Sequence, residues 1–309
     1  MNLSLALAFE RSWNRTVRML FRPFDLGKWC SIGFAAFLSE GLAKSWGGGT
    51  SYKSGGHGGV SPDVSAALHR IADFLSHPVW GTLIILLLSF LCVLALVVLW
   101  LNCRGRFVFL DNVVHERAAI AEPWRRYRAQ GNSLFLFTLV SLVVCGAVLL
   151  FITLPVLPAI LDAAANGRWK ALAMIAIGGW IIALIPVATL IACFFLFLYQ
   201  FVVPLMFRHQ IGVRAAWGRF LGLLGQHPLH FLGFVLGYLL LSVLFAGTVV
   251  AVGLATCCIG FMIMGLPYIG SVVLLPVEVL FRGLGPEVLS QFGPDYFQFG
   301  PPSSTSAPA

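Results

Sequence analysis

The sequence contains little charge for its length, with 20 Lys and Arg and 12 Asp and Glu in 309 residues, or 10%. Roughly a quarter of the residues in a typical soluble domain are charged. This chain has too few charged residues to cover a water-exposed surface of that kind. The shortage excludes an ordinary soluble enzyme, a disordered protein and a nucleic-acid-binding protein. With 59% hydrophobic residues and a mean hydropathy of +0.91, the composition is that of a polytopic integral membrane protein.

Sequence motifs for catalysis and metal binding are also missing. The seven cysteines lie mostly in apolar runs and form no CxxC pair, so they predict neither a zinc site nor a disulfide framework. No GxSxG, HExxH, phosphate-binding loop or paired-acid motif occurs. We therefore predict a protein that is not an enzyme and that has no catalytic residues, no metal and no other cofactor.

Six apolar stretches are long enough to cross about 30 Å of hydrocarbon as helices of about 20 residues. They lie near 27–45, 79–101, 134–156, 172–197, 229–252 and 257–280. The predicted fold is therefore an all-α bundle of six transmembrane helices over residues 1–282. The apolar residues around the fourth stretch run from 171 to 207, too far for one straight crossing. We expect a bend near Pro186 or Pro204 and an extension beyond the membrane surface.

The distribution of the cations predicts the orientation. If the N-terminus is cytoplasmic and six helices cross, 15 of the 20 Lys and Arg lie on the cytoplasmic side and five on the outer side. Such an excess in short loops is typical of the cytoplasmic side. We therefore predict a multi-pass protein of the cell membrane with both termini in the cytoplasm.

Three short segments share a pattern, and each precedes a predicted pair of spans. In each, Trp is followed two residues later by Arg: ERSWNRTVRML, AEPWRRYRAQ and RAAWGRFLGLL. Apolar residues recur at helical spacing in all three, which predicts an amphipathic helix at the membrane surface in each. In the first segment they are Ala6, Phe9, Trp13, Val17 and Leu20. The unit of surface helix and hairpin thus forms three parallel repeats, near 1–101, 113–205 and 211–282.

These surface helices are the predicted sites of lipid contact. Trp at a membrane interface places its ring at headgroup depth, while Arg contacts water or phosphate. Cations near an anionic membrane contribute about 1 kcal/mol each. The candidate headgroup residues are Arg11, Trp13, Arg15, Arg18, Arg22, Trp124, Arg125, Arg126, Trp217 and Arg219. The alternative is that they only set the topology and the depth of the protein.

The same regions resemble a known group of proteins. The strings RSWNRTVRMLFRPFDLGKW, NVVHERAAIAEPWRRYRAQGNSLFLF and RHQIGVRAAWGRFLGLLGQHPLHFLGF are similar to an uncharacterised family of bacterial membrane proteins. That family resembles the membrane domain attached to some glycerophosphodiester phosphodiesterases. The resemblance covers about residues 8–283 and implies a helical membrane fold in a bacterial inner membrane. The chain has no room for the phosphodiesterase barrel or its metal ligands, so the resemblance does not imply hydrolysis.

Two glutamates lie within the predicted spans, where ionisable side chains are costly and are functional candidates. Glu40 precedes Lys44 by four residues, and Glu278 precedes Arg282 by four, so each has a predicted local ion-pair partner. In the fifth span, Gly233 and Gly237 form a GxxxG motif. The motif predicts close helix packing, either within the bundle or in a dimer.

Three functions follow from these features. The leading hypothesis is a non-enzymatic membrane scaffold that binds anionic lipid headgroups, a membrane protein partner or a second copy of itself through its cytoplasmic helices, with no nucleic-acid partner. The first alternative is a transporter or lipid translocator, which a cavity reaching Glu40 or Glu278 would favour. The second is a lipid-modifying enzyme. Residues 283–309 are rich in Pro and Ser and predict a disordered cytoplasmic tail.

Overall fold

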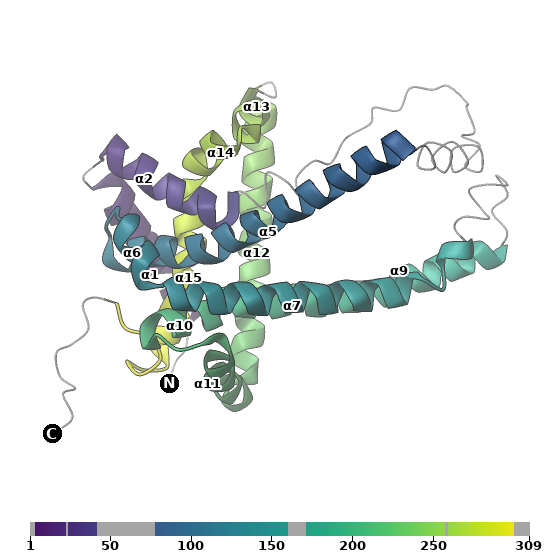
Figure 1. Cartoon of the computed structure of the whole chain (residues 1–309). Coiled ribbons are helices and arrows are strands. Elements are labelled where there is room, and N and C mark those ends of the chain that lie inside the picture. The colour runs from purple at the N-terminus through teal and green to yellow at the C-terminus, as the bar shows by residue number, and fades with distance from the viewer. Residues whose placement is uncertain (1–3, 23, 42–77, 160–170, 257–258, 300–309) are drawn as a thin grey trace. The chain divides into compact units, whose positions relative to one another are not determined.

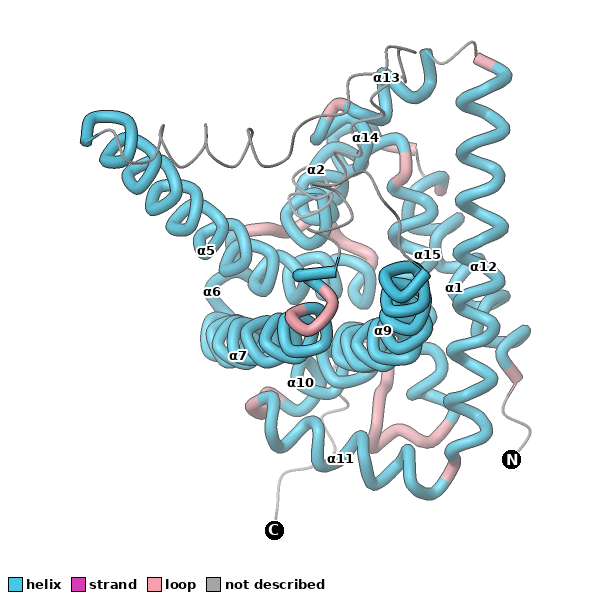
Figure 2. Tube along the Cα trace, turned by 90° about the vertical axis from the view of Figure 1, so that its right-hand side faces the viewer, coloured by secondary structure: helices cyan, strands magenta, loops and turns pink. Residues whose placement is uncertain are grey.

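The computed structural model describes residues 4–22, 24–41, 78–159, 171–256 and 259–299. The regular structure of these residues is entirely helical, without a strand (Figures 1 and 2). Contacts divide the chain into two compact units. The first unit comprises Met1–Gly49, Val98–Phe137 and Phe195–Ala309, and the second comprises Thr50–Val97 and Thr138–Phe194. An all-α fold was predicted, and the described residues confirm it.

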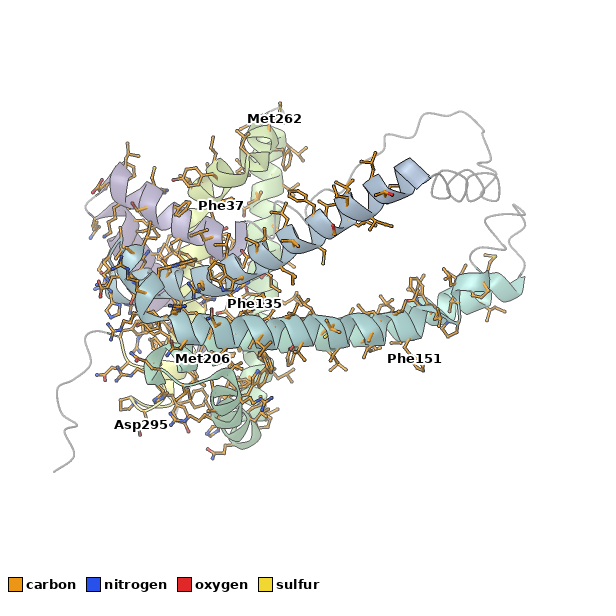
Figure 3. All side chains as sticks on the ribbon, viewed as in Figure 1. Phe37, Phe135, Phe151, Met206, Met262 and Asp295 are labelled. Atoms are coloured by element: carbon orange, nitrogen blue, oxygen red, sulfur yellow. The ribbon has the colours of Figure 1, made fainter. Side chains whose placement is uncertain are left out.

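Among the described residues, four helical segments are long and apolar enough to span a membrane, and each overlaps one of the predicted spans. The helices that contain them are α5 (Pro78–His115), α7 (Arg128–Thr153), α9 (Ala171–Phe197) with its continuation, and α12 (Pro228–Ala255). Their large apolar side chains are widely exposed, as at Ile85, Phe151 and Leu229, which are 69%, 79% and 78% exposed. Side chains of this kind face lipid in a membrane protein. Figure 3 shows Phe151 on the outside of α7.

The helix α9 extends well past the length of one membrane crossing, as the long apolar run predicted. Its helical path continues through a π-helical turn, η2 (Leu198–Val202), into α10 (Val203–His209). The helix passes through Pro186, and the π turn ends just before Pro204. Since proline lacks a backbone donor, a widened turn beside it is the expected distortion. The residues of η2 and α10 are largely buried in the core of the first unit, which explains why they are apolar without facing lipid.

The first and sixth predicted spans are not single long helices. The first consists of α2 (Leu26–Ala36) and a π-helical turn, η1 (Phe37–Gly41), and residues 42–45 lie outside the described ranges. The sixth is divided among α13 (Ile259–Gly265), α14 (Pro267–Val273) and α15 (Leu275–Gln291). Prolines in the first turns of α14 and α15 account for these breaks. The structure therefore supports four candidate spans, and six are not confirmed.

The C-terminal segment is folded further than the sequence suggested. Helix α15 continues through Gly283 to Gln291, and its residues from Arg282 to Leu289 are buried. Phe297 is also buried, at 1% exposed, in the core of the first unit. The prediction of a disordered tail beginning at residue 283 is therefore wrong for residues 283–299. It overlooked the apolar side chains in this segment that pack into the core, and residues 300–309 lie outside the described part.

The three segments with Trp and Arg differ in structure. They correspond to α1 (Leu5–Phe21), α6 (Ala121–Arg126) and α11 (Val213–Gln226), with 17, 6 and 14 residues. The second is short because α5 continues to His115 and the chain then turns at Glu116, whose φ is 52°. The threefold repeat is therefore not confirmed.

The first unit is built around a cluster of phenylalanines. Phe201 of η2 contacts Phe220 of α11 and both Phe231 and Phe234 of α12, with ring centroids 4.7 to 5.4 Å apart. On another side of this unit, α1 packs antiparallel to α15. Ser4 bonds with Gln291 at one end of the pair, and the hydroxyl of Ser12 donates to the carbonyl of Leu280, at 2.8 Å, farther along. This pairing brings the two ends of the described chain together.

Candidate functional sites

The basic residues of α1 line a pocket in the first unit, which we call the basic pocket. Its volume is about 680 Å³, and α15 and the segment after it complete its wall. Four of its residues are the arginines predicted for headgroup contact, Arg11, Arg15, Arg18 and Arg22, and one is a glutamate, Glu287. With four guanidinium groups and one carboxylate, the wall suits a phosphate or another anion.

Arg15 forms ion pairs with two glutamates. Its Nη2 lies 3.0 Å from Oε1 of Glu287, whose side chain is 3% exposed, and its Nη1 lies 3.6 Å from Oε1 of Glu116. Its guanidinium also lies 3.6 Å from the ring centroid of Phe299. Arg18 reaches Glu116 at 3.7 Å, but its side chain is 61% exposed. The predicted set therefore divides, because Arg15 holds α1 to α15 whereas Arg18 is accessible to a ligand.

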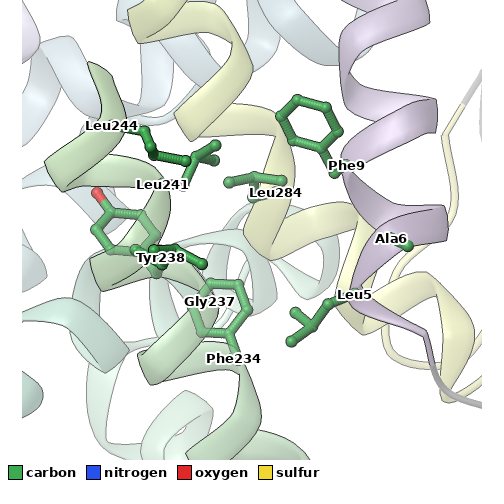
Figure 4. A pocket seen from close by; sticks show the side chains of 10 residues that line it. Leu5, Ala6, Phe9, Phe234, Gly237, Tyr238, Leu241, Leu244 and Leu284 are labelled. Carbon is green, nitrogen blue, oxygen red and sulfur yellow. The ribbon is translucent and has the colours of Figure 1, made fainter. Parts of the chain in front are cut away.

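The apolar side of α1 faces an apolar groove of about 220 Å³ (Figure 4). Leu5 and Phe9 of α1 line it from one side, Tyr238 and Leu244 of α12 from another, and Leu284 of α15 lies between them. The side of α1 that is buried in the protein carries mostly small or polar residues: Ala8, Ser12, Thr16, Met19 and Leu20. Helix α1 thus has an apolar side and a basic side that are both accessible, separated by the seam that contacts α15.

The two glycines of the predicted GxxxG motif face α1. A Cβ atom at Gly237 would lie 3.3 Å from Cδ1 of Leu5, and a Cβ atom at Gly233 would lie 3.8 Å from it. The absence of side chains at these positions leaves space for Leu5 against α12. In the first unit, the motif therefore contributes to packing between two helices of the same chain.

A second cavity, of about 310 Å³, lies between η1, η2, α12 and α15, and we call it the polar cavity. Both predicted intramembrane glutamates line it, Glu40 from η1 and Glu278 from α15. Gln200 of η2 and Arg282 of α15 add an amide and a guanidinium, and Ser242 lines it halfway along α12. The two glutamates, predicted separately from the sequence, are thus brought to one site.

Glu40 pairs with a cation from a distant part of the chain. Its Oε1 lies 3.6 Å from Nη1 of Arg106 in α5. The guanidinium of Arg106 in turn lies 3.6 Å from the ring centroid of Tyr199. The predicted partner, Lys44, lies outside the described residues. The ion pair with Arg106 ties η1 to α5.

Arg282 is 4% exposed, and its guanidinium is held by backbone carbonyl groups. Its Nη1 donates to the carbonyl of Tyr199 at 3.3 Å, and its Nη2 donates to that of Arg106 at 3.0 Å. Neither its Nε nor Oε1 of Gln200, a residue 7% exposed, has a hydrogen-bond partner among the described residues. A buried donor or acceptor without a partner is costly. Two residues that line the polar cavity, Gln200 and Arg282, thus each hold a buried polar atom that has no partner in the described part of the chain.

Two π-helical turns position polar side chains at this cavity. Glu40 lies in η1 and Gln200 lies in η2. Such turns are rare and are frequent at functional sites. Glycines in α5 and α15 allow these helices to approach the two π-helical turns closely. A Cβ atom at Gly105 of α5 would lie 2.7 Å from the carbonyl carbon of Leu38, and one at Gly285 of α15 would collide with the carbonyl oxygen of Gln200.

Trp124 and Trp217, predicted to lie at headgroup depth, contact other side chains of the first unit. The Arg104 guanidinium lies 4.4 Å from the ring centroid of Trp100 and 5.2 Å from that of Trp124. Trp217 packs against Phe220, with ring centroids 5.6 Å apart. Trp13 is 45% exposed. The remaining predicted cations, Arg125, Arg126 and Arg219, are also exposed.

A third polar cluster surrounds Asp111, which is fully buried at the end of α5. Arg117 donates to Oδ2 of Asp111 from Nε, at 3.1 Å, and from Nη2, at 2.9 Å, and it also pairs with Glu122 at 3.0 Å. Burial lowers the pKa of Arg117, but the hydrogen bonds and charges of these two acids outweigh it and raise that pKa overall. Burial, followed by the charge of Asp111, raises the pKa of Tyr127 to about 12. This cluster fixes the turn between α5 and α6.

Sequence reasoning missed Gln200 and Arg106 at the polar cavity and Glu287 at the basic pocket, and it gave Arg282 only a structural role. Gln200 had a visible signal, since it is a polar residue inside the long apolar run from 171 to 207. Arg282 had been assigned to a local ion pair with Glu278. Arg106 lies 66 positions along the chain from Glu40, and no local pattern connects the two.

Comparison with known proteins gives one family. Residues 4–289 match the model of a family of unknown function, DUF7544. No curated protein and no solved structure matches the chain significantly. In the described ranges, no three His, Cys, Asp or Glu side chains are grouped so that they could hold a metal ion.

Proposed function

The chain belongs to the DUF7544 family, and we propose that it is a non-enzymatic integral membrane protein that binds anionic lipid headgroups through α1. One observation carries the proposal: the four arginines of α1 line a single pocket with one glutamate, Glu287. Such a wall suits the phosphate group of a lipid headgroup, since one guanidinium can donate to two phosphate oxygens at once.

The position of α1 beside a candidate span supports this proposal. Its accessible apolar residues Leu5 and Phe9 line a groove with Leu240 and Leu244 of α12, which are 63% and 59% exposed. A helix with one apolar and one basic side lies in the membrane interface, with the apolar side toward the acyl chains. The basic pocket would then face the phosphate layer. In this arrangement Arg11, Arg18 and Arg22 contact lipid, while Arg15 supports them through Glu287.

We propose six spans, with both termini in the cytoplasm of a bacterial cell. The support is the charge distribution. If only the four candidate spans cross, the 20 cations divide 11 to 9 between the two sides, whereas six spans divide them 15 to 5. The positive-inside rule therefore favours crossings by the regions around 27–45 and 257–280, the second built from several short helices.

We also propose two features that rest on the sequence alone. The first is the threefold repeat, with α1, α6 and α11 as related surface segments of unequal length. The second is the relation to the membrane domain of glycerophosphodiester phosphodiesterases, which rests on the sequence resemblance.

Transport is the second candidate function, and one specific observation favours it. Glu40 and Glu278 line the same cavity, halfway along the candidate span α12. A polar site inside a membrane protein is typical of transport proteins.

The lipid proposal can be tested with the purified full chain in neutral detergent. We expect dioleoyl phosphatidylglycerol to raise Tm more than dioleoyl phosphatidylcholine does. The triple variant Arg11→Gln, Arg18→Gln, Arg22→Gln should bind phosphatidylglycerol at least tenfold more weakly in native mass spectrometry, because each cation contributes about 1 kcal/mol. Inorganic phosphate serves as a separate probe, and stabilisation by phosphate alone would indicate a soluble anion instead of a lipid.

A matched variant controls for net charge. Arg128, Arg208 and Arg214 lie outside the basic pocket and are not among the predicted headgroup residues, so their replacement with Gln removes the same charge. This variant should retain most of the preference for phosphatidylglycerol. Equal losses in the two triple variants, or equal stabilisation by the two lipids, would contradict a headgroup site on α1.

A further inference from the structure

We infer that the polar cavity is a binding site for a small zwitterion, a molecule with an amine and an acidic group a few ångströms apart. This inference is independent of lipid binding by α1. It rests on the opposite charges that line one cavity and on the buried polar atoms there that have no partner among the described residues.

The charges around the cavity are balanced. Two carboxylates, Glu40 and Glu278, and one guanidinium group, Arg282, line the cavity. A second guanidinium group, Arg106 of α5, pairs with Glu40 and balances the second carboxylate. A ligand with a net charge would upset this balance in a site of low dielectric constant. A ligand without net charge, but with both signs, would preserve it.

The negative and positive side chains of the cavity are spaced in a way that suits such a ligand. Glu278 and Arg282 are four residues apart on α15, so they lie on the same side of this helix, one turn from each other. Arg282 uses two of its five donors on backbone carbonyls, and its Nε lacks a partner in the described part of the chain. The acidic group of the ligand would accept from Arg282. Its amine would donate to the carboxylate of Glu278 and to Oε1 of Gln200.

The remaining wall is aromatic. Tyr238 and Phe245 of α12 line the cavity together with Phe281 of α15. Their rings contact each other, with centroids 5.0 Å apart for Tyr238 and Phe281 and 5.6 Å apart for Phe245 and Phe281. Aromatic faces attract an ammonium group and also pack against an apolar substituent. With a volume of about 310 Å³, the cavity has space for an amino acid with a medium-sized apolar side chain.

Two sources supply this chemistry, a free amino acid and a phosphoethanolamine headgroup. The probes are therefore L-leucine and glycerophosphoethanolamine, added to the purified full chain and measured by Tm and by equilibrium binding. Leucine amide and N-acetyl-leucine are matched controls, since each has one charge of leucine and lacks the other. We expect one or both zwitterions to bind, and each control to bind at least tenfold more weakly. Failure of both zwitterions, or equal binding of a singly charged control, would overturn the inference.

Variants connect the binding to this cavity. Glu278→Gln keeps the size of the side chain and should weaken binding of the zwitterion at least tenfold, whereas Glu10→Gln, at an exposed position of α1, should leave it unchanged. If Glu278→Gln fails to fold, Ala246→Phe tests the site by narrowing the cavity from α12. Its control is Val243→Phe on the same helix, at a residue that is 60% exposed and does not line the cavity. Unchanged binding in a folded Glu278→Gln or Ala246→Phe protein would contradict the site.

Discussion

Arg15 of α1 and Glu287 of α15 form an ion pair at 3.0 Å across 272 residues of sequence. Both side chains are largely buried, at 12% and 3% exposed. The pair forms the inner wall of the basic pocket and holds α1 against α15. Helix α15 also carries Glu278 and Arg282, which line the polar cavity. The ion pair therefore connects α1, whose arginines line the basic pocket, to a helix that lines both sites.

Removing the cation of this pair should destabilise the protein. In Arg15→Gln, the carboxylate of Glu287 stays buried without its main partner, at a cost of about 3 kcal/mol. We expect a clear fall in Tm of the full chain in detergent. Arg18→Gln is the matched control, since that side chain is 61% exposed and its pair with Glu116 should contribute less than about 1 kcal/mol. Equal Tm values for the two variants would show that the pair with Glu287 is not important for stability.

The contact between Gly285 and η2 is a second test of the fold. A Cβ atom at this position would collide with the carbonyl oxygen of Gln200. We expect Gly285→Ala to cost about 1–3 kcal/mol because the backbone must shift. Gly222→Ala in α11 is the control, with nothing within 4 Å of its Cβ. That variant should be neutral or stabilise by up to about 1 kcal/mol, since Ala favours helix. A neutral Gly285→Ala would refute the close approach of α15 to η2.

Stability should fall at high pH because of Tyr127. Its pKa is raised to about 12 in the folded chain, against about 10 when unfolded. Below pH 10 both states keep the phenol proton, so the group has no effect. Between pH 10 and 12 the unfolded state releases this proton while the folded state retains it, which favours unfolding by at most about 2 to 3 kcal/mol.

The comparison that isolates this effect is the slope of Tm against pH. Tyr127→Phe removes the titrating group, so its Tm should decline less steeply than that of the unchanged protein from pH 10 to 12. Parallel slopes would mean that the phenol of Tyr127 has its ordinary pKa in the folded chain.

The sequence predicted those features that depend on local pattern. Four of the predicted spans correspond to long apolar helices of the described residues. Helix α7 begins at Arg128, before the predicted third span, so Ser133 lies inside it, where its hydroxyl accepts from the amide of Val213 at 3.3 Å. A Cβ atom at Gly131 of α7 would lie 2.8 Å from Cγ of Arg104 in α5, so the two helices approach closely there, and no local pattern in the sequence indicates this contact.

Only those parts of the candidate sites that depend on local pattern could be predicted from the sequence. Glu40 and Glu278 were identifiable because a carboxylate in an apolar stretch is unusual. Their meeting in one cavity depends on η1, α12 and α15 packing together, and Arg106 joins them from yet another helix. The sequence likewise identified the four arginines of α1 as candidate headgroup residues but could not show that Glu287 forms an ion pair with Arg15. Residue type identified the candidates, and tertiary contacts determined their roles.

The number of spans can be decided by the location of residue 53. With six spans, Lys53 and the N-terminus lie on opposite sides of the membrane, whereas with four they lie on the same side, since the first candidate span begins at Gly81. We expect alkaline phosphatase fused after Lys53 to be active outside the cytoplasm. A fluorescent protein fused after Ala119, between α5 and α6, should report the cytoplasm. An inactive phosphatase at Lys53 in an expressed fusion would remove the crossing near 27–45 and, with it, the 15-to-5 division of the cations.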